Sequence, residues 1–336
     1  MDHNRIHVPP SVYTPNKTLN EILYPETSAY DEGYLKVSSV HNVYYAQYGN
    51  PDGIPVLVVH GGPGAGCNTS HVRVCDPTYF RIICLDQRGA VRSQPMGEIR
   101  ENTTLDLIAD MEKLRMHLNI DQWILWGFSW GSALSLAYSQ HYPNAVIGLV
   151  LRGVFLGREE ECLQLINNMK DHFPEAWQEF AEFLPENERH DLLKAYYLRV
   201  IDPDPKVHLP AAKAFMKYDI ICSTLLKRDD LVEQFLENSV QVLCVTRIFM
   251  HYAYHQCFFT PNQLLNNAHK IKHLPVTIIH GRYDVITRPQ AAYELHKALP
   301  NSKLIFIQDA GHAGIEPGIS TAVVKTFNNF KECKEL

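Results

Sequence analysis

The chain has 336 residues, of which 46% are hydrophobic and 20% are charged. This composition is typical of a globular protein with a large core, and the length predicts one large domain or a domain with an insertion. The formal net charge is -6 and no Lys/Arg cluster is visible, which argues against nucleic acid as a partner.

The sequence also disfavours membrane insertion and metal binding. Its first residues lack an apolar signal core, and no apolar run approaches the roughly 18 residues of a membrane span, so we expect a cytoplasmic protein. The eight cysteines include no Cys-x-x-Cys pair. Two histidine pairs have helical spacing but lack a zincin glutamate and an evident third ligand: His251/His255 and His269/His273. We therefore expect no metal.

The predicted strands begin with residues 34–48, whose partial alternation indicates an antiparallel hairpin followed by a turn at 50–53. Short continuous apolar runs come next, which is the pattern of strands buried on both faces of a sheet. These runs are residues 56–59, 82–85, 123–126, 147–151, 276–279 and 304–307.

Amphipathic segments separate these runs. Residues 102–104 predict the start of a helix that continues to Leu118, and residues 288–299 and 319–331 have similar patterns. Alternating strands and helices predict the α/β class, with a mostly parallel, doubly wound sheet. The alternation stops between Phe155 and Lys272, where helical periodicity predicts a lid. We therefore predict a core of residues 1–154 and 273–336 and an inserted helical cap of residues 155–272.

A nucleophile motif follows the third apolar run. Gly127-Phe128-Ser129-Trp130-Gly131 separates the predicted strand 123–126 from a helix-like segment. In α/β-hydrolases this Gly-x-Ser-x-Gly pattern forms a sharp turn that presents the serine hydroxyl above the sheet, and glycines avoid collisions two positions on either side. The context predicts the α/β-hydrolase fold with Ser129 as the nucleophile.

Candidates for the acid and the base follow two later strands. A serine needs a base and an acid that orients it, and in this fold the chain order is Ser, acid, His. Asp284 follows the run 276–279 and His312 follows the run 304–307. Both lie at the carboxyl ends of strands, where open α/β sheets place their active sites. We predict that Asp284 orients His312.

An oxyanion hole requires two backbone N–H donors. Trp130, which directly follows the nucleophile, is one candidate. The glycine-rich segment 60–64 follows the first parallel strand, where the lack of side chains allows its backbone to approach a substrate. We predict Gly62 as the second donor.

Taken together, these motifs resemble the proline iminopeptidase (prolyl aminopeptidase) family, over about residues 23–330. The resemblance rests on His60-Gly61-Gly62-Pro63-Gly64, Asp86-Gln87-Arg88-Gly89, Asn102-Thr103-Thr104, Ser129-Trp130-Gly131-Ser132, Leu151-Arg152-Gly153, Gly281-Arg282-Tyr283-Asp284 and Gly311-His312 with Glu316-Pro317-Gly318. It implies a capped α/β-hydrolase that removes N-terminal proline from peptides without a cofactor. It also implies Ser129, Asp284 and His312 as nucleophile, orienting acid and general base.

The chain departs from the family pattern near the predicted site. Phe128 replaces the second glycine of a Gly-Gly-Ser-Trp-Gly motif, which the elbow tolerates. Val91 replaces a turn glycine, so that turn must differ or be strained, because β-branched residues resist positive φ. Ala313 stands where the family usually has a serine.

Larger departures lie in the lid. Family members bind the free amine of the substrate with two cap glutamates, and the corresponding positions here are Asp219 and Phe249. Asp219 keeps a carboxylate on a shorter side chain, whereas Phe249 offers only a weaker cation–π contact. The resemblance thus implies Asp219, Phe249 and Phe128 as substrate contacts with altered amine recognition.

Three functions fit the sequence. The first is a proline-iminopeptidase-type serine aminopeptidase acting on a small peptide or proline derivative. The second is an esterase or amidase of the same fold without a free-amine requirement. The third is a noncatalytic ligand-binding homologue, which the intact Ser129, Asp284 and His312 disfavour. The sequence makes no prediction of the oligomeric state.

Overall fold

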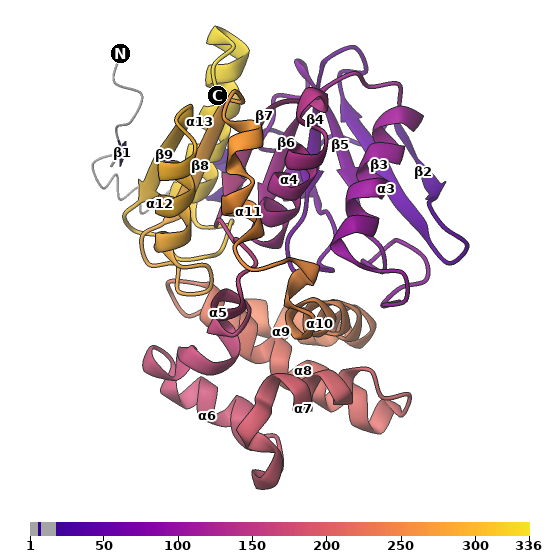
Figure 1. Cartoon of the computed structure of the whole chain (residues 1–336), viewed down its shortest axis with the longest axis vertical. Coiled ribbons are helices and arrows are strands. Elements are labelled where there is room, and N and C mark those ends of the chain that lie inside the picture. Colours follow the sequence, from indigo (N-terminus) through magenta and orange to yellow (C-terminus); the bar gives the residue numbers. More distant parts are fainter. Residues whose placement is uncertain (1–5, 8–17) are drawn as a thin grey trace.

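The computed structural model describes residues 6–7 and 18–336, and a nine-stranded sheet lies in the upper part of the molecule as seen in Figure 1. The strands are β1 (Ile6–His7), β2 (Asp31–Lys36), β3 (Asn42–Gly49), β4 (Ile54–Val59), β5 (Phe80–Leu85), β6 (Trp123–Phe128), β7 (Val146–Arg152), β8 (Val276–Gly281) and β9 (Ser302–Ile307). Their order in the sheet is β1-β9-β8-β7-β6-β4-β5-β3-β2. β3 pairs antiparallel with both β2 and β5, and all other pairs are parallel.

The helices fall into those beside the sheet and those between β7 and β8. The α-helices are α1 (Leu19–Ile22), α2 (Thr69–Val72), α3 (Thr104–His117), α4 (Trp130–His141), α5 (Glu159–Cys162), α6 (Pro174–Glu182), α7 (Leu192–Val200), α8 (Pro205–Ser223), α9 (Asp229–Glu237), α10 (Ser239–Tyr254), α11 (Gln263–Asn266), α12 (Pro289–Ala298) and α13 (Pro317–Cys333). Short 3₁₀ segments are Pro143–Ala145, Met169–Asp171, Glu186–Asp191, Gln256–Phe258 and Ala268–Ile271, and Gln164–Asn168 is a π segment.

Helices cover both faces of the sheet, because successive strand residues point to opposite faces. In β4, Leu57 belongs to an apolar cluster that includes residues of α3, α4 and α12. Its neighbours Val56 and Val58 belong to a second cluster that includes residues of α13. Each face is therefore apolar, which explains why the strands are continuous apolar runs rather than alternating ones.

The predicted fold class is confirmed. The six apolar runs lie in β4 to β9, and residues 34–48 form most of the antiparallel hairpin of β2 and β3, in which Tyr34 pairs with Tyr44. The helices predicted at 102–118, 288–299 and 319–331 correspond to α3, α12 and α13. In the described part of the chain, no helix combines the length and the apolar character that crossing a bilayer requires. The cytoplasmic location stays a prediction.

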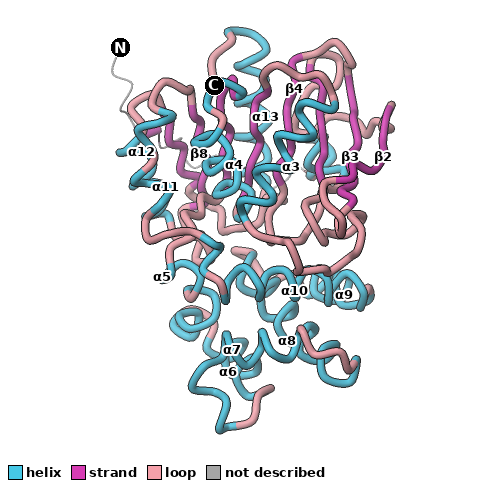
Figure 2. Tube along the Cα trace, turned by 45° about the vertical axis from the view of Figure 1, so that its right-hand side comes forward, coloured by secondary structure: helices cyan, strands magenta, loops and turns pink. Residues whose placement is uncertain are grey.

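The chain between β7 and β8 is helical and contains no strand within its described residues. Helices α5 to α10 lie beyond one end of the sheet strands (Figures 1 and 2), and α6 to α10 contribute to a separate apolar cluster. Leu264, Ala268 and Ile271, at the end of this region, instead pack in the cluster of the sheet. The division into core and cap at residues 155 and 272 stays a prediction.

Candidate active site

Ser129 lies in a strained turn between β6 and α4. Its φ of 55° and ψ of -125° are unusual for a residue with a side chain. A Cβ on Gly127 would lie 2.4 Å from the Gly131 carbonyl oxygen, and a Cβ on Gly131 would lie 1.9 Å from the carbonyl oxygen of Val59. Only glycine therefore fits at the two positions that flank the turn, as the sequence motif predicts.

The structure brings Ser129, Asp284 and His312 together from three loops that follow β6, β8 and β9. The Ser129 Oγ atom lies 3.1 Å from His312 Nε2, and His312 Nδ1 lies 2.8 Å from Asp284 Oδ2. With Nδ1 held by a carboxylate, Nε2 faces the serine hydroxyl, which is the arrangement that general-base activation of a serine requires.

Asp284 is buried, with 2% of its surface exposed, and several groups fix its orientation. Its Oδ1 accepts the N–H groups of Ile286 and Thr287, and its Oδ2 accepts the Thr287 hydroxyl at 2.9 Å. Burial alone would raise the pKa of Asp284, but His312, His280 and the Thr287 N–H together hold this pKa below its usual value. The carboxylate therefore stays charged beside His312.

The glycine-rich segment after β4 passes directly beside the nucleophile turn. A Cβ on Gly61 would lie 3.1 Å from the Ser129 Cβ, and Gly62 has a φ of +108°. Trp130 is the first residue of α4, so its N–H has no acceptor within the helix. Gly62, Ser129 and Trp130 line the same cavity. Their grouping has the parts of an oxyanion hole, and the donor roles stay a prediction.

Gln87 links this glycine-rich segment to α4. Its backbone N–H lies 3.0 Å from His60 Nε2, and His60 Nδ1 lies 2.9 Å from the Gly61 carbonyl oxygen and 3.2 Å from the Gly66 nitrogen. Burial lowers the pKa of His60, which favours a neutral ring. The Gln87 side chain donates to the His60 carbonyl and accepts the Trp130 indole N–H at 2.8 Å. The Gln87 side chain thus joins the segment that contains Gly62 to Trp130, and these two residues are the predicted oxyanion donors.

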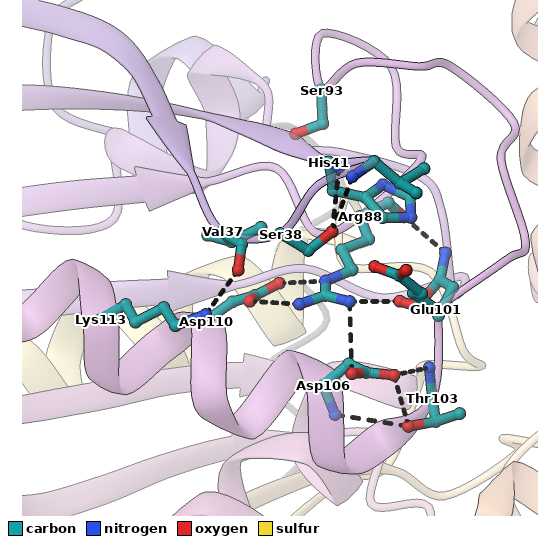
Figure 3. Close-up of polar contacts among 12 residues, drawn as sticks. Val37, Ser38, His41, Arg88, Ser93, Glu101, Thr103, Asp106, Asp110 and Lys113 are labelled. Carbon is teal, nitrogen blue, oxygen red and sulfur yellow. Dashed lines mark hydrogen bonds and ion pairs between the residues drawn. The ribbon is translucent and has the colours of Figure 1, made fainter.

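Arg88, which follows Gln87 in the loop after β5, connects this loop to α3 (Figure 3). The Arg88 side chain is almost fully buried, and its Nε and Nη2 donate to the two carboxylate oxygens of Asp110 at 2.6 and 2.8 Å. Its Nη1 donates to the Glu101 carbonyl and lies 3.3 Å from Asp106. Removing one partner of such a buried pair costs about 3–5 kcal/mol, so this network holds the loop that carries Gln87.

Val91, which replaces a family glycine, is accommodated without a positive φ. It is absent from the non-glycine residues with positive φ in the described chain. Gly66 has a φ of +72°, and a Cβ there would lie 2.9 Å from Val91 Cγ2. The turn therefore differs from the family pattern by the close packing of the Val91 side chain on Gly66, and Val91 itself has no positive φ.

A cavity of about 460 Å³ opens at Ser129. Sheet loops form one wall, and α5, α8, α9 and α10 form the other, so the helical region between β7 and β8 closes the site. The predicted contacts Phe128, Asp219 and Phe249 all line this cavity. Most other lining side chains from the helical region are apolar: Phe155, Leu165, Met216, Ile220, Phe235 and Val245.

Asp219 contributes a carboxylate to this largely apolar wall. Burial raises the pKa of Asp219 to about 6, and nearby His312 acts in the opposite direction. Among residues 6–7 and 18–336, none donates a hydrogen bond to its carboxylate. Phe249 packs its ring against Phe215 with centroids 4.8 Å apart, so it presents an aromatic surface to the cavity.

Two further charged residues of the cavity were not predicted. Arg152, at the end of β7, donates through Nη1 to the His312 carbonyl at 2.6 Å, and burial lowers the pKa of Arg152 to about 10. Glu161 Oε2 accepts the N–H groups of Leu156 and Arg158, and Arg158 Nη2 donates to Glu161 Oε1 at 3.4 Å. The Leu151-Arg152-Gly153 motif was the only sequence signal for Arg152, and Glu161 had none.

One histidine of each pair has a backbone acceptor nearby. His251 Nε2 lies 3.0 Å from the Asn102 carbonyl oxygen, and its ring lies 4.9 Å from that of His255. His269 Nδ1 lies 2.9 Å from the Asn266 carbonyl oxygen. Within the described residues, no group of three His, Cys, Asp or Glu side chains could hold a metal ion.

Comparison with known proteins gives the same fold and a family. The model of the alpha/beta hydrolase fold matches residues 54–318. Proline iminopeptidase of Arabidopsis thaliana is 44% identical over 305 residues, covering 90% of this chain and 80% of the relative. Proline iminopeptidase of Xylella fastidiosa is 42% identical over 310 residues, covering 92% of this chain and 99% of the relative.

Solved structures with low identity share the fold. A bromoperoxidase from Bacillus anthracis has a TM-score of 0.62 at 20% identity, covering 90% of this chain and all (100%) of that chain. An esterase from Exiguobacterium antarcticum has a TM-score of 0.61 at 17% identity, covering 89% and 98%. At such identity the likeness concerns the fold alone, whereas the relatives above exceed 40% identity and match along 80% and 99% of their own length. The chain therefore belongs to the proline iminopeptidase family of α/β-hydrolases.

Proposed function

We propose that this protein is a serine aminopeptidase that releases N-terminal proline from peptides through an acyl-enzyme. The observation that carries the proposal is the contact series from Ser129 to His312 to Asp284, at the floor of a cavity also lined by Asp219, whose carboxylate accepts no hydrogen bond from the described residues. Membership of the family supports the same substrate class.

In this mechanism Ser129 Oγ attacks the carbonyl carbon of the proline residue while His312 Nε2 takes the hydroxyl proton. Asp284 keeps the Nδ1 proton in place and stabilises the imidazolium. The negative oxygen of the tetrahedral intermediate accepts the N–H groups of Gly62 and Trp130. His312 then donates its proton to the departing amine, and water releases proline by the same steps in reverse order.

Asp219 supplies the recognition of the free amine. An ionised carboxylate without a protein partner in an apolar cavity attracts the ammonium of the substrate, because the surroundings screen the charge poorly. The aromatic rings of Phe128 and Phe249 line the space around the ring of the substrate proline. We also propose that residues 155–272 act as the cap that excludes longer chains from the amine side.

One observation favours a second candidate, an esterase or amidase without a free-amine requirement. Phe249 stands where the family pattern has a carboxylate, and its ring is part of the apolar wall. A neutral acyl group would also fit such a wall.

A paired assay separates the two candidates. Proline arylamide, acetyl-proline arylamide and a short-chain nitrophenyl ester are compared by kcat/KM under one condition. A strong preference for the free-amine arylamide supports the aminopeptidase. Equal turnover of the free and acetylated arylamides contradicts it and favours the second candidate. The Ser129→Ala variant is the control for contaminating hydrolases.

A further inference from the structure

Glu316 joins two parts of the structure that are far apart in the sequence. It immediately precedes α13, in the loop that follows β9. Its Oε2 accepts the Gly311 N–H at 2.6 Å, and its Oε1 accepts the Leu225 N–H at 2.8 Å. Gly311 belongs to the sheet side of the site, whereas Leu225 follows α8 in the helical region.

Each of the two bonded segments leads to a different part of the active site. Gly311 directly precedes His312. Leu225 follows Ser223 and Thr224, which line the cavity, and α8 carries Asp219 one turn earlier. The two backbones are close, since a Cβ on Gly311 would lie 3.1 Å from the Leu225 nitrogen. A larger residue than glycine would push these segments apart.

The charge state of Glu316 suits a bridge of this kind. An ionised carboxylate is acceptor-only and can serve both N–H groups at once, with bonds stronger than those to a neutral acceptor. Burial raises the pKa of Glu316 above its usual value, and the two N–H groups and His312 offset this rise only in part. Asp284 and Arg152 are the other charged groups that act on it.

We propose that Glu316 is a positioning residue that sets the place of Asp219 relative to His312 and Ser129, and so couples amine recognition to the reacting groups. The proposal rests on the aminopeptidase function, because it needs Asp219 to bind the substrate amine. Small errors of position between a binding group and a reacting group cost on the order of tenfold to a hundredfold in rate.

Two changes at Leu225 test the bridge from the cap side. Leu225→Pro removes the N–H that Glu316 accepts and leaves the bond to Gly311. Thr224 has φ of -109° and ψ of 141°, which is the backbone conformation that precedes proline. Leu225→Ala removes the same side chain, which is 41% exposed, and keeps the N–H. Glu316→Gln, with one acceptor oxygen instead of two, tests the bridge from the other side.

The readout is the ratio of kcat/KM for proline arylamide to that for acetyl-proline arylamide. We expect this ratio to fall by about tenfold in Leu225→Pro and Glu316→Gln and to stay at the wild-type value in Leu225→Ala. A purely structural role would lower both specificity constants equally and leave the ratio unchanged, which would overturn the proposal. An equal fall in Leu225→Ala would overturn it as well. If Leu225→Pro fails to fold, Glu316→Gln decides.

Hydrogen exchange separates this proposal from the proposed function. If wild type shows no preference for the free amine, the aminopeptidase function fails, and the bridge is then judged by exchange at the Leu225 and Gly311 amides. Slow exchange at both amides in wild type, with faster exchange in Glu316→Gln, supports the bridge. Fast exchange at these amides in wild type overturns it.

Discussion

Replacing Asp219 by asparagine should stabilise the folded protein while weakening its preference for free amines. The pKa of Asp219 in the folded chain is raised to about 6, whereas an aspartate in an unfolded chain has a pKa of about 3.9. The stabilising effect of the protonated group is complete below the unfolded pKa and is lost as the pH rises through the folded pKa. At pH 7.5 the folded protein therefore holds an unfavourable buried charge that asparagine lacks.

The size of the effect follows from the two pKa values. The difference of about 2 between the folded value and the unfolded one corresponds to about 3 kcal/mol, at about 1.4 kcal/mol per unit. Because the Asp219 side chain keeps some contact with solvent, we reduce this to about 2 kcal/mol. For a chain of 336 residues the unfolding entropy is about 0.7 kcal/mol/K, so Asp219→Asn should raise Tm by about 3 °C at pH 7.5.

Thermal unfolding at pH 7.5 and pH 4 tests this reasoning. The gain in Tm should be large at pH 7.5 and much smaller at pH 4, where folded wild type already carries a protonated Asp219. Asp121→Asn, on an exposed turn before β6, is the matched control and should change Tm little at either pH. Equal gains at both pH values, or no gain at pH 7.5, would refute the inference that the stability cost arises from the ionised carboxylate.

Four other outcomes are expected. Ser129→Ala should lose on the order of 10⁶ in kcat while keeping its Tm, and retention of a tenth of wild-type turnover would exclude Ser129 as the nucleophile. Gln87→Leu should lower kcat by about tenfold on both arylamides and on the ester, since it removes the bonds to the His60 carbonyl and the Trp130 indole beside the predicted oxyanion donors; an unchanged kcat would show that this link is dispensable. Phe249→Glu should raise kcat/KM for proline arylamide by about ten- to a hundredfold. A constant ratio of this value to kcat/KM for the acetylated arylamide would show that another group binds the amine. In wild type the same ratio should rise with pH through about 6, as Asp219 ionises, and a flat ratio would count against Asp219.

The sheet and the nucleophile turn were predictable because their determinants are local. A strand buried on both faces needs a continuous apolar run, and β4 to β9 each contain one. The turn at Ser129 needs glycine at two fixed positions, where any Cβ would collide with backbone oxygens. Asp284 and His312 could be located by their order along the chain, because each follows a recognisable strand.

Features that depend on distant segments could not be predicted. The contact between Glu316 and Leu225 joins residues 91 positions apart, and neither position has a pattern that indicates the other. The raised pKa of Asp219 arises from the packing of the helices around it rather than from its neighbours in sequence. Gln87 lies in a motif that indicated family membership, but its bond to Trp130 became visible only in the structure.

The helical region between β7 and β8 is, in topological terms, one very long crossover between two adjacent parallel strands. Parallel neighbours always need a connection that runs back from the carboxyl end of one strand to the amino end of the next, and Leu264, Ala268 and Ile271 pack in the cluster of the sheet on this return. Evolution can therefore lengthen, shorten or replace this connection without altering the sheet that carries Ser129 and His312. The substrate range of such a protein can diverge quickly while its reaction chemistry is inherited unchanged.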